Sequence, residues 1–195
     1  MNSFDTTLFL WLNAGPSPHV AALYFATFMS DVAPNMAGIG LLVAAVAGGS
    51  GVRKAVLRCL LGMALSWMVV STLRRGFPMP RPAALQMGWQ WMQHSSSSGF
   101  PSHHAAGAWA CWAGLALSPG LRVRPAWALA GLVLAVSIAW SRVYLGVHFP
   151  RDVVVGAAIG WISAVGVAAL ADRLGLLLRR RRVLRLRQRR LLATA

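Results

Sequence analysis

Uncharged apolar runs follow one another along most of the chain, separated by short polar or basic segments. Six such runs are present, at positions 20–30, 32–52, 59–73, 105–121, 125–141 and 153–171. A helix that spans the hydrocarbon core of a bilayer needs about 20 residues, with a range of roughly 17 to 25. The last three runs meet that length, and the third does so if it begins at Ala55 and Arg58 reaches the interface. We therefore predict an all-α fold, a multispanning membrane helical bundle with about six transmembrane helices.

The first two runs are less regular, because Asp31, Pro34 and Asn35 interrupt a stretch of about thirty residues. This pattern favours two short helices that meet at a turn. One long kinked helix is the alternative.

The two ends of the chain differ from its middle. In segment 1–17, Phe4, Leu8 and Leu12 stand at helical spacing before a Gly-Pro-Ser-Pro breaker, which predicts an amphipathic helix in the membrane interface. The other end, 173–195, is rich in arginine. We expect one integral membrane domain over 1–172, followed by a basic cytoplasmic tail over 173–195.

Composition agrees with a membrane protein. The chain is 57% hydrophobic and 12% charged, with 19 basic against 4 acidic residues and a net charge of +15. A nucleic-acid binder could be as basic, but nine of the positive residues lie between Arg173 and Arg190 and the others punctuate apolar runs. This distribution is typical of multispanning membrane proteins. We expect membrane lipids rather than nucleic acid as partners.

The basic residues also predict an orientation. With six crossings, three clusters fall on one face, which the positive-inside rule makes cytoplasmic: Arg53, Lys54 and Arg58; Arg122 and Arg124; and the C-terminal tail. The opposite face then holds segments 74–104 and 142–152, which are rich in arginine and histidine. Arginine on that face runs against the rule, so a functional reason is needed.

Polar residues on that face gather in three segments, 74–82, 99–104 and 141–152. Arg74, Arg81 and Arg142 supply planar donors that suit phosphate, and like charges that crowd together need an anion between them. Ser102 precedes a long helical run, as an N-cap does. The backbone N–H groups of His103 and His104 would then form an anion site at a helix N-terminus.

The third segment adds a pair of titratable side chains. Pro150 fits the first position of a helix, so Asp152 stands in its first turn, near enough to accept a hydrogen bond from His148. A carboxylate there would orient the imidazole and make its other nitrogen a better nucleophile. His104 is a second imidazole that could act as general acid.

Simpler interpretations exist for each piece. Ser102 alone could be a plain helix cap, and Arg142 or Arg151 alone could be an interfacial anchor. Three histidines could also form a zinc site. A lipid-binding or transport protein would need the arginines but not the His148–Asp152 pair or His104.

The whole set resembles the three-part signature of the type 2 phosphatidic acid phosphatase superfamily: Lys-x6-Arg-Pro, Pro-Ser-Gly-His and Ser-Arg-x5-His-x3-Asp. The third part is matched in full by Ser141, Arg142, His148 and Asp152. The second is matched by Pro101, Ser102 and His104, with His103 where glycine is usual, and the first by Arg81 and Pro82, with Arg74 in place of lysine.

This resemblance implies a six-helix membrane enzyme with a phosphatidic acid phosphatase type 2/haloperoxidase-like core that needs no metal or other cofactor. His148 would attack phosphorus to form a phosphohistidine, Asp152 would orient it, and His104 would protonate the leaving group. The phosphate oxygens would be held by Arg74, Arg81, Ser102, the His103 amide and Arg142. Arg75 could take the lysine role in place of Arg74. Arg75 and Arg151 are also candidates for a second phosphate.

Within this superfamily, the size of the chain, its Phe-Leu-Trp-Leu-Asn-Ala opening and segment 139–148 resemble the small bacterial undecaprenyl-diphosphate phosphatases. This implies conversion of undecaprenyl diphosphate to undecaprenyl phosphate at the periplasmic face of the bacterial inner membrane, for recycling of the cell-wall carrier lipid. The same scaffold also serves phosphatidylglycerophosphate, phosphatidate and lipid A phosphatases. Transfer of the phosphoryl group to another lipid is a further alternative.

Overall fold

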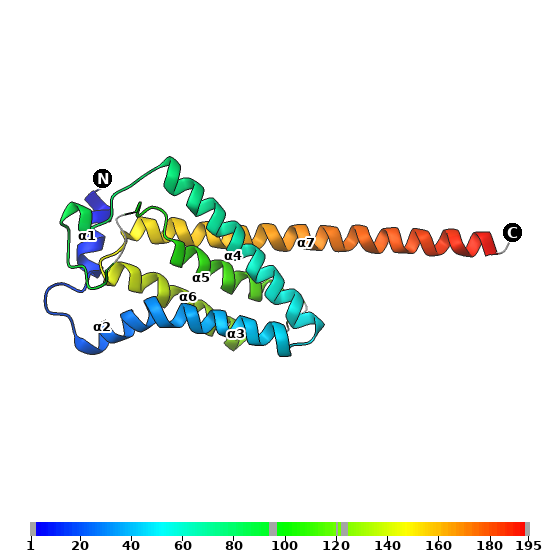
Figure 1. Ribbon diagram of the computed structural model, residues 1–195, viewed down its shortest axis with the longest axis horizontal. Coiled ribbons are helices and arrows are strands. Elements are labelled where there is room, and N and C mark those ends of the chain that lie inside the picture. The colour runs from blue at the N-terminus through cyan, green and yellow to red at the C-terminus, as the bar shows by residue number, and fades with distance from the viewer. Residues whose placement is uncertain (1–2, 94–96, 120, 122–124, 194–195) are drawn as a thin grey trace.

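The computed structural model describes residues 3–93, 97–119, 121 and 125–193, and these are helical apart from loops and turns. Arg122 and Arg124, which the sequence places in a cytoplasmic cluster, lie outside the described residues. In chain order (Figure 1) the elements are α1 (Ser3–Leu12), α2 (Val20–Thr27), the π-helix η1 (Phe28–Val32), α3 (Ala33–Ala47), α4 (Ser50–Gly76), the 3₁₀ helix η2 (Ala83–Leu85), α5 (His103–Ala116), α6 (Pro125–Tyr144) and α7 (Pro150–Ala193).

Helices α2, η1 and α3 follow one another without a break, so the expectation of two short helices meeting at a turn is wrong. The alternative, one long helix, is what forms. The π turn explains why the polar residues do not end it, since the N–H of Ala33 donates to the carbonyl of Phe28, five residues back. A π turn is a way to accommodate a proline, which cannot donate a helical hydrogen bond. The Asn35 amide also donates to the Asp31 carbonyl at 2.6 Å.

Among the described residues, four helices are long and apolar enough to cross a membrane: Val20–Ala47, Ser50–Gly76, Pro125–Tyr144 and Pro150–Leu178. This is fewer than the six predicted, because the first two runs form one helix and α5 has 14 residues.

Helix α5 packs against α4, α6 and α7. Its buried residues are all small: Ala105, Ala106, Ala110, Ala113 and Gly114. Small residues let membrane helices approach closely. A Cβ atom at Gly114 would lie 2.8 Å from the Cα of Cys59 on α4, so this crossing has room only for glycine.

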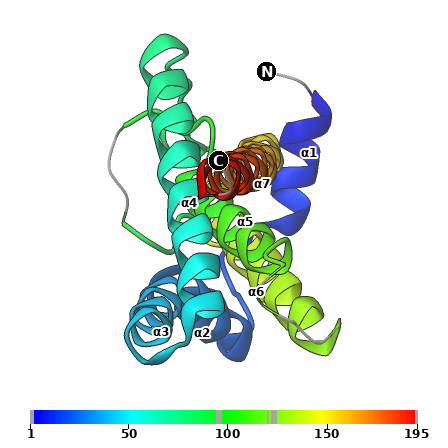
Figure 2. The same cartoon turned by 90° about the vertical axis from the view of Figure 1, so that its right-hand side faces the viewer.

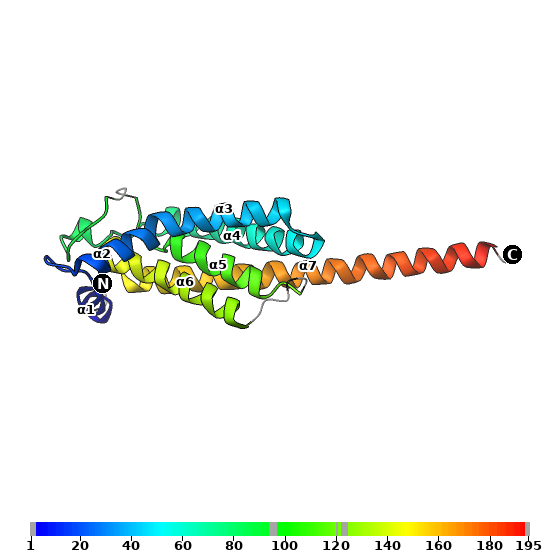
Figure 3. The ribbon, with the colours of Figure 1, turned by 90° about the horizontal axis from the view of Figure 1, so that it is seen from below.

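Helices α3 to α7 run alternately in opposite directions along the bundle (Figure 1). Viewed along the bundle, α7 lies beside α5, with α4 and α6 flanking this pair (Figure 2), and α3 runs beside α4 (Figure 3). One end of the bundle carries α1, the loop after α4 and the α6–α7 junction. The other carries the basic start of α4 at Arg53 and Lys54, and beyond it α7 projects as a single helix that continues through the predicted tail to Ala193.

Helix α1 packs against α6 and α7 at the end that carries the α6–α7 junction. Its buried residues are Asp5 and Phe9, one turn apart, whereas Phe4 of the predicted apolar stripe is 70% exposed. Phe9 meets Phe149 edge to face, with ring centroids 5.2 Å apart, and Leu12 packs on the same cluster. The predicted helix forms, and its contact with the bundle runs through Phe9 and Leu12 rather than Phe4.

Candidate active site

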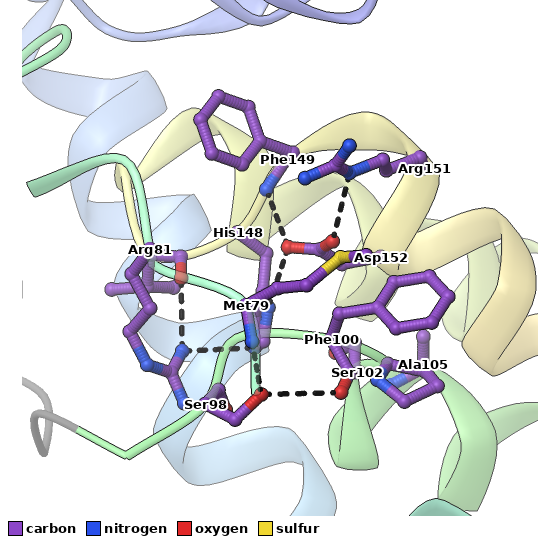
Figure 4. Close-up of polar contacts among 12 residues, drawn as sticks. Met79, Arg81, Ser98, Phe100, Ser102, Ala105, His148, Phe149, Arg151 and Asp152 are labelled. Atoms are coloured by element: carbon purple, nitrogen blue, oxygen red, sulfur yellow. Dashed lines mark hydrogen bonds and ion pairs between the residues drawn. The ribbon is translucent and has the colours of Figure 1, made fainter. Parts of the chain in front are cut away.

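The three polar segments singled out in the sequence converge at the end of the bundle that carries α1 (Figure 4). The first follows α4, the second leads into α5 and the third joins α6 to α7. They are cross-linked by hydrogen bonds between backbone and side chains. This convergence brings Arg81, Ser102, His148 and Asp152 together.

The α6–α7 junction is a tight turn that carries His148 inside the protein. The backbone N–H groups of Val147 and His148 both donate to the Arg142 carbonyl, at 3.1 and 3.2 Å. Gly146 has a φ of +77°, and a Cβ atom there would come within 3.0 Å of the carbonyl carbon of Trp89. Only glycine fits such a position. His148 is consequently 1% exposed.

The His148 ring lies between a carboxylate and a guanidinium. Nδ1 is 3.4 Å from Asp152 Oδ2, which also accepts the Phe149 N–H at 3.0 Å. On the other side, Nε2 is 3.3 Å from Arg81 Nη1. Because a guanidinium can only donate, Nε2 is the acceptor and the proton lies on Nδ1, facing Asp152. This tautomer has its lone pair on Nε2.

Arg81 ties two of the segments together. It donates from Nε to the Ser97 carbonyl at 2.9 Å and from Nη1 to the Val147 carbonyl at 2.9 Å, and Nη2 reaches the Ser98 carbonyl at 3.3 Å. Burial lowers the pKa of Arg81, and the nearby Asp152 carboxylate opposes that shift. Most of the donors of Arg81 are therefore used within the protein.

The start of α5 is linked to α4 and to α7. Ser102 is fully buried; its Oγ accepts from the Ala105 N–H at 3.5 Å as a helix N-cap, and its own N–H donates to the Asp152 carbonyl at 2.9 Å. The carbonyl just before it, on Pro101, accepts from Arg74 Nε at 2.8 Å. The first residue of α5, His103, stacks on Trp67 of α4, with centroids 6.0 Å apart.

Arg142 is 1% exposed, and part of its guanidinium has no hydrogen-bond partner in the part of the chain that the structure describes. Nη1 donates to Ser30 Oγ of η1 and to Met92 Sδ at 3.5 Å. Nε and Nη2 find no hydrogen-bond partner among the described residues. Buried donors left unpaired cost about 1–3 kcal/mol each. An anion beside Arg142 would satisfy them.

The two arginines expected at a second phosphate differ in setting. Arg151 Nε is 3.2 Å from Asp5 Oδ2 and 3.6 Å from Asp152 Oδ1, and its backbone N–H donates to Asp5 Oδ1 at 2.9 Å. Arg75, in the last turn of α4, is exposed.

The family model of the PAP2 superfamily matches residues 55–175, which include all three segments. The chain belongs to the PAP2 superfamily. It is thus a PAP2-type membrane lipid phosphatase.

Known proteins resemble this PAP2 chain over most of its length. It is 29% identical over 181 residues to the Escherichia coli K12 protein described as "Putative undecaprenyl-diphosphatase YbjG". The alignment covers 90% of this chain and 86% of that relative. The crystal structure of Aquifex aeolicus LpxE superposes with a TM-score of 0.74 at 25% identity, over 85% of this chain and 95% of that one. A PAP2-type phosphatidylglycerolphosphate phosphatase of Bacillus subtilis shares the fold, with a TM-score of 0.57 at 22% identity over 87% and 95% of the two chains.

Sequence reasoning missed two residues that contact the arginines of this PAP2 site, Asp5 and Ser30. Asp5 carried a usable signal, because it is one of four acidic residues and stands in an apolar opening segment. Ser30 carried none. A serine in an apolar run is ordinary, and its contact with Arg142 joins residues 112 positions apart.

Proposed function

We propose that this protein removes the terminal phosphate of undecaprenyl diphosphate through a phosphohistidine on His148. The product, undecaprenyl phosphate, would return to cell-wall synthesis. The observation that carries the chemistry is the His148 ring, buried between Asp152 and Arg81 with its lone pair on Nε2. The substrate is supported by the description of the Escherichia coli relative and by its coverage of 90% of this chain.

The first step breaks the bond between the terminal phosphorus and the bridging oxygen. His148 Nε2 attacks that phosphorus, and the electron pair of the broken bond leaves with undecaprenyl phosphate. His104 gives a proton to the departing oxygen. Asp152, as acceptor of the Nδ1–H bond, stabilises the positive charge that develops on the ring.

The second step restores the enzyme. Water attacks the phosphorus of the phosphohistidine, His104 takes its proton, and the N–P bond breaks to release inorganic phosphate. The imidazole regains its neutral tautomer with Nδ1–H toward Asp152. Phosphoryl transfer to a second lipid would differ only in the nucleophile of this step.

The phosphate oxygens need donors, and Arg142 is best placed to supply them, because its Nε and Nη2 are buried without a partner among the described residues. The N-terminal amides of α5 at His103 and beyond add the partial positive charge of a helix end. Arg74 and Arg81 complete the positive charge. Arg75 and Arg151 remain the candidates for the proximal phosphate.

We place the site at the periplasmic face of the bacterial inner membrane. The support is electrostatic: Arg53, Lys54 and the arginine-rich end of α7 lie at the opposite end of the bundle from His148. Clusters of this kind stay on the cytoplasmic side.

The decisive experiment is to trap the intermediate. Purified protein in detergent, mixed with terminally labelled undecaprenyl diphosphate and quenched with alkali, should carry label in a bond that alkali spares and acid cleaves. His148→Ala should carry none. Label in an acid-stable bond, or label that survives in His148→Ala, would overturn the mechanism.

Substrate rank tests the choice of lipid. A diphosphate releases a phosphate ester, which is a far less basic leaving group than an alkoxide. We therefore expect a higher kcat/KM for undecaprenyl diphosphate than for phosphatidate or phosphatidylglycerophosphate, with chelator present. A preference for a glycerolipid monophosphate would refute the carrier-lipid role but not the phosphatase activity.

A further inference from the structure

An apolar groove with a volume of about 650 Å³ runs alongside α5, between α3 and α6. At one end it reaches His103 and His104, at the site described above. Apart from these two histidines, its lining consists of glycine, alanine, proline, cysteine and larger apolar residues. Such a surface suits hydrocarbon and offers nothing to a polar metabolite.

The groove is hollow because its walls lack side chains at several points. Gly38 on α3 and Gly107 on α5 both line it, and a Cβ atom added at either would meet nothing within 4 Å. In Figure 2, α3 and α6 stand on either side of α5. While α2 and η1 pack against α6, α3 packs against α4, and the space between α3 and α6 is left to the groove.

We propose that this groove holds the part of the substrate's prenyl chain next to the headgroup, so that the enzyme selects its lipid by chain as well as by phosphate. The inference rests on the proposed function, because it takes the direction of the chain from the reaction. His104 protonates the leaving group, and the leaving group carries the chain. The chain must therefore depart on the side of His104, where the groove begins.

The dimensions fit a lipid chain. From His104 to Leu115, both of which line the groove, α5 rises roughly 16 Å at 1.5 Å per residue. One leaflet of a bilayer contributes about half of a 30 Å hydrocarbon core. The volume lies within the roughly 300–1,000 Å³ of small-molecule sites. The groove can thus accompany a chain through one leaflet, and the rest of a longer chain would lie in the bilayer.

The groove contributes selectivity more than affinity. Moving a chain from bilayer into protein brings little hydrophobic gain, because lipid tails are as apolar as leucine. What differs between chains is van der Waals fit against the walls. Filling the groove should therefore lower kcat/KM for a substrate with a long chain and leave it unchanged for one without a long chain.

Leucine at the two glycines gives the test. Gly107 and Gly38 line the groove, and in Gly107→Leu and Gly38→Leu the new Cβ atom would meet no protein atom within 4 Å. Leucine also favours helix over glycine. Gly166→Leu on α7 is the matched control, since its Cβ would also meet nothing within 4 Å and Gly166 does not line the groove. Thermal unfolding in detergent checks that all three variants are folded.

Phosphate release is measured with undecaprenyl diphosphate and with isopentenyl diphosphate, which has the same headgroup on a five-carbon chain. We expect the two groove variants to lower kcat/KM for undecaprenyl diphosphate by roughly tenfold or more, as a misfitted apolar pocket does, and to leave isopentenyl diphosphate unchanged. Gly166→Leu should change neither.

Two results would overturn the inference. Unchanged turnover of undecaprenyl diphosphate by both groove variants would show that the chain lies elsewhere. Equal losses of kcat/KM on both substrates would show that the substitutions disturb the phosphate site, or that the groove is an interface with a second copy of the protein. A wild-type protein that releases phosphate from neither diphosphate would instead refute the proposed function, and the inference with it.

Discussion

Two aspartates at opposite ends of the bundle form ion pairs with arginines, in very different surroundings. Asp172 Oδ1 lies 2.6 Å from Arg58 Nη2, and its side chain is 55% exposed. Asp5 lies 3.2 Å from Arg151, its side chain is 9% exposed, and it also accepts the backbone N–H of Arg151 in the first turn of α7. Since Asp152 stands next in that turn, Asp5 holds α1 against the element that orients His148.

Asp5→Asn should therefore lower both stability and activity. It removes the charge that partners Arg151 in a buried setting, where an unsatisfied group costs about 1–3 kcal/mol. Asp172→Asn breaks an exposed pair, worth about 0–1 kcal/mol, far from His148. Thermal unfolding and phosphate release in detergent compare the two variants. If the two variants lowered stability and phosphate release to the same extent, a positioning role for Asp5 would be contradicted.

The roles of the two histidines can be separated by the leaving group. His148→Ala should abolish turnover, while His104→Ala should lose about 10² to 10⁴-fold, which is what general acid catalysis supplies. An activated aryl phosphate, whose leaving group needs no proton, should recover much of the His104 loss and none of the His148 loss. A common response of both variants to the leaving group would show that these roles are wrongly assigned.

At the scale of elements, the long helix from Val20 to Ala47 shows how polar residues in an apolar run can mislead. A proline with polar neighbours usually ends a helix, but here Asp31 lies within a π turn and Pro34 and Asn35 follow it in α3. Both outcomes place Asp31 and Pro34 between apolar stretches, so the pattern cannot separate them. The turn sets Ser30, 1% exposed, against Arg142. π turns are frequent at functional sites.

Ser30→Ala tests whether this turn positions Arg142. Without the hydroxyl acceptor, the Arg142 guanidinium loses one of its anchors, and we expect kcat/KM to fall by roughly tenfold, a loss of about 1.4 kcal/mol. Ser66→Ala is the matched control, because Ser66 is fully buried and, among the residues that the structure describes, its hydroxyl donates within its own helix, to the Met63 carbonyl at 2.8 Å. Steady-state kinetics on both variants make the comparison. Equal losses would mean that buried serines in general, not this contact, sustain activity.

Local spacing explains which parts of the site could be predicted. His148 and Asp152 stand four residues apart across a helix start, and Ser102 directly precedes α5, so chain geometry alone brings each beside its neighbours. Asp5 meets Arg151 across 146 residues and Ser30 meets Arg142 across 112. Such contacts depend on how helices pack. The shortness of α5 could not be predicted for the same reason, because a helix packed inside the bundle can be shorter than a membrane span.

On the scale of the whole molecule, the basic clusters and the candidate active site lie at opposite ends of the bundle. The α3–α4 turn leads into Arg53 and Lys54, and α7 projects past this end carrying most of the remaining arginines. The end with His148 also contains arginines: Arg81 and Arg142 are held in buried contacts and Arg151 in a partly buried one, while Arg75 is exposed. Arginines held in a site need not count as topological signals, so the positive-inside rule supports the proposed periplasmic orientation of the site.

Two single cysteines test that orientation, in a protein whose own Cys59 and Cys111 are replaced by alanine. Ser97→Cys lies in the exposed loop at the His148 end, and Gly49→Cys lies in the exposed α3–α4 turn, where a Cβ atom meets nothing within 4 Å. An impermeant thiol reagent added outside intact spheroplasts should label Ser97→Cys and not Gly49→Cys. Permeabilisation should expose both, and the cysteine-free protein should stay unlabelled throughout. Labelling of both variants from outside would contradict the proposed membrane topology. Labelling of Gly49→Cys alone would show the opposite orientation, with the site at the cytoplasmic face and the arginines of α7 outside.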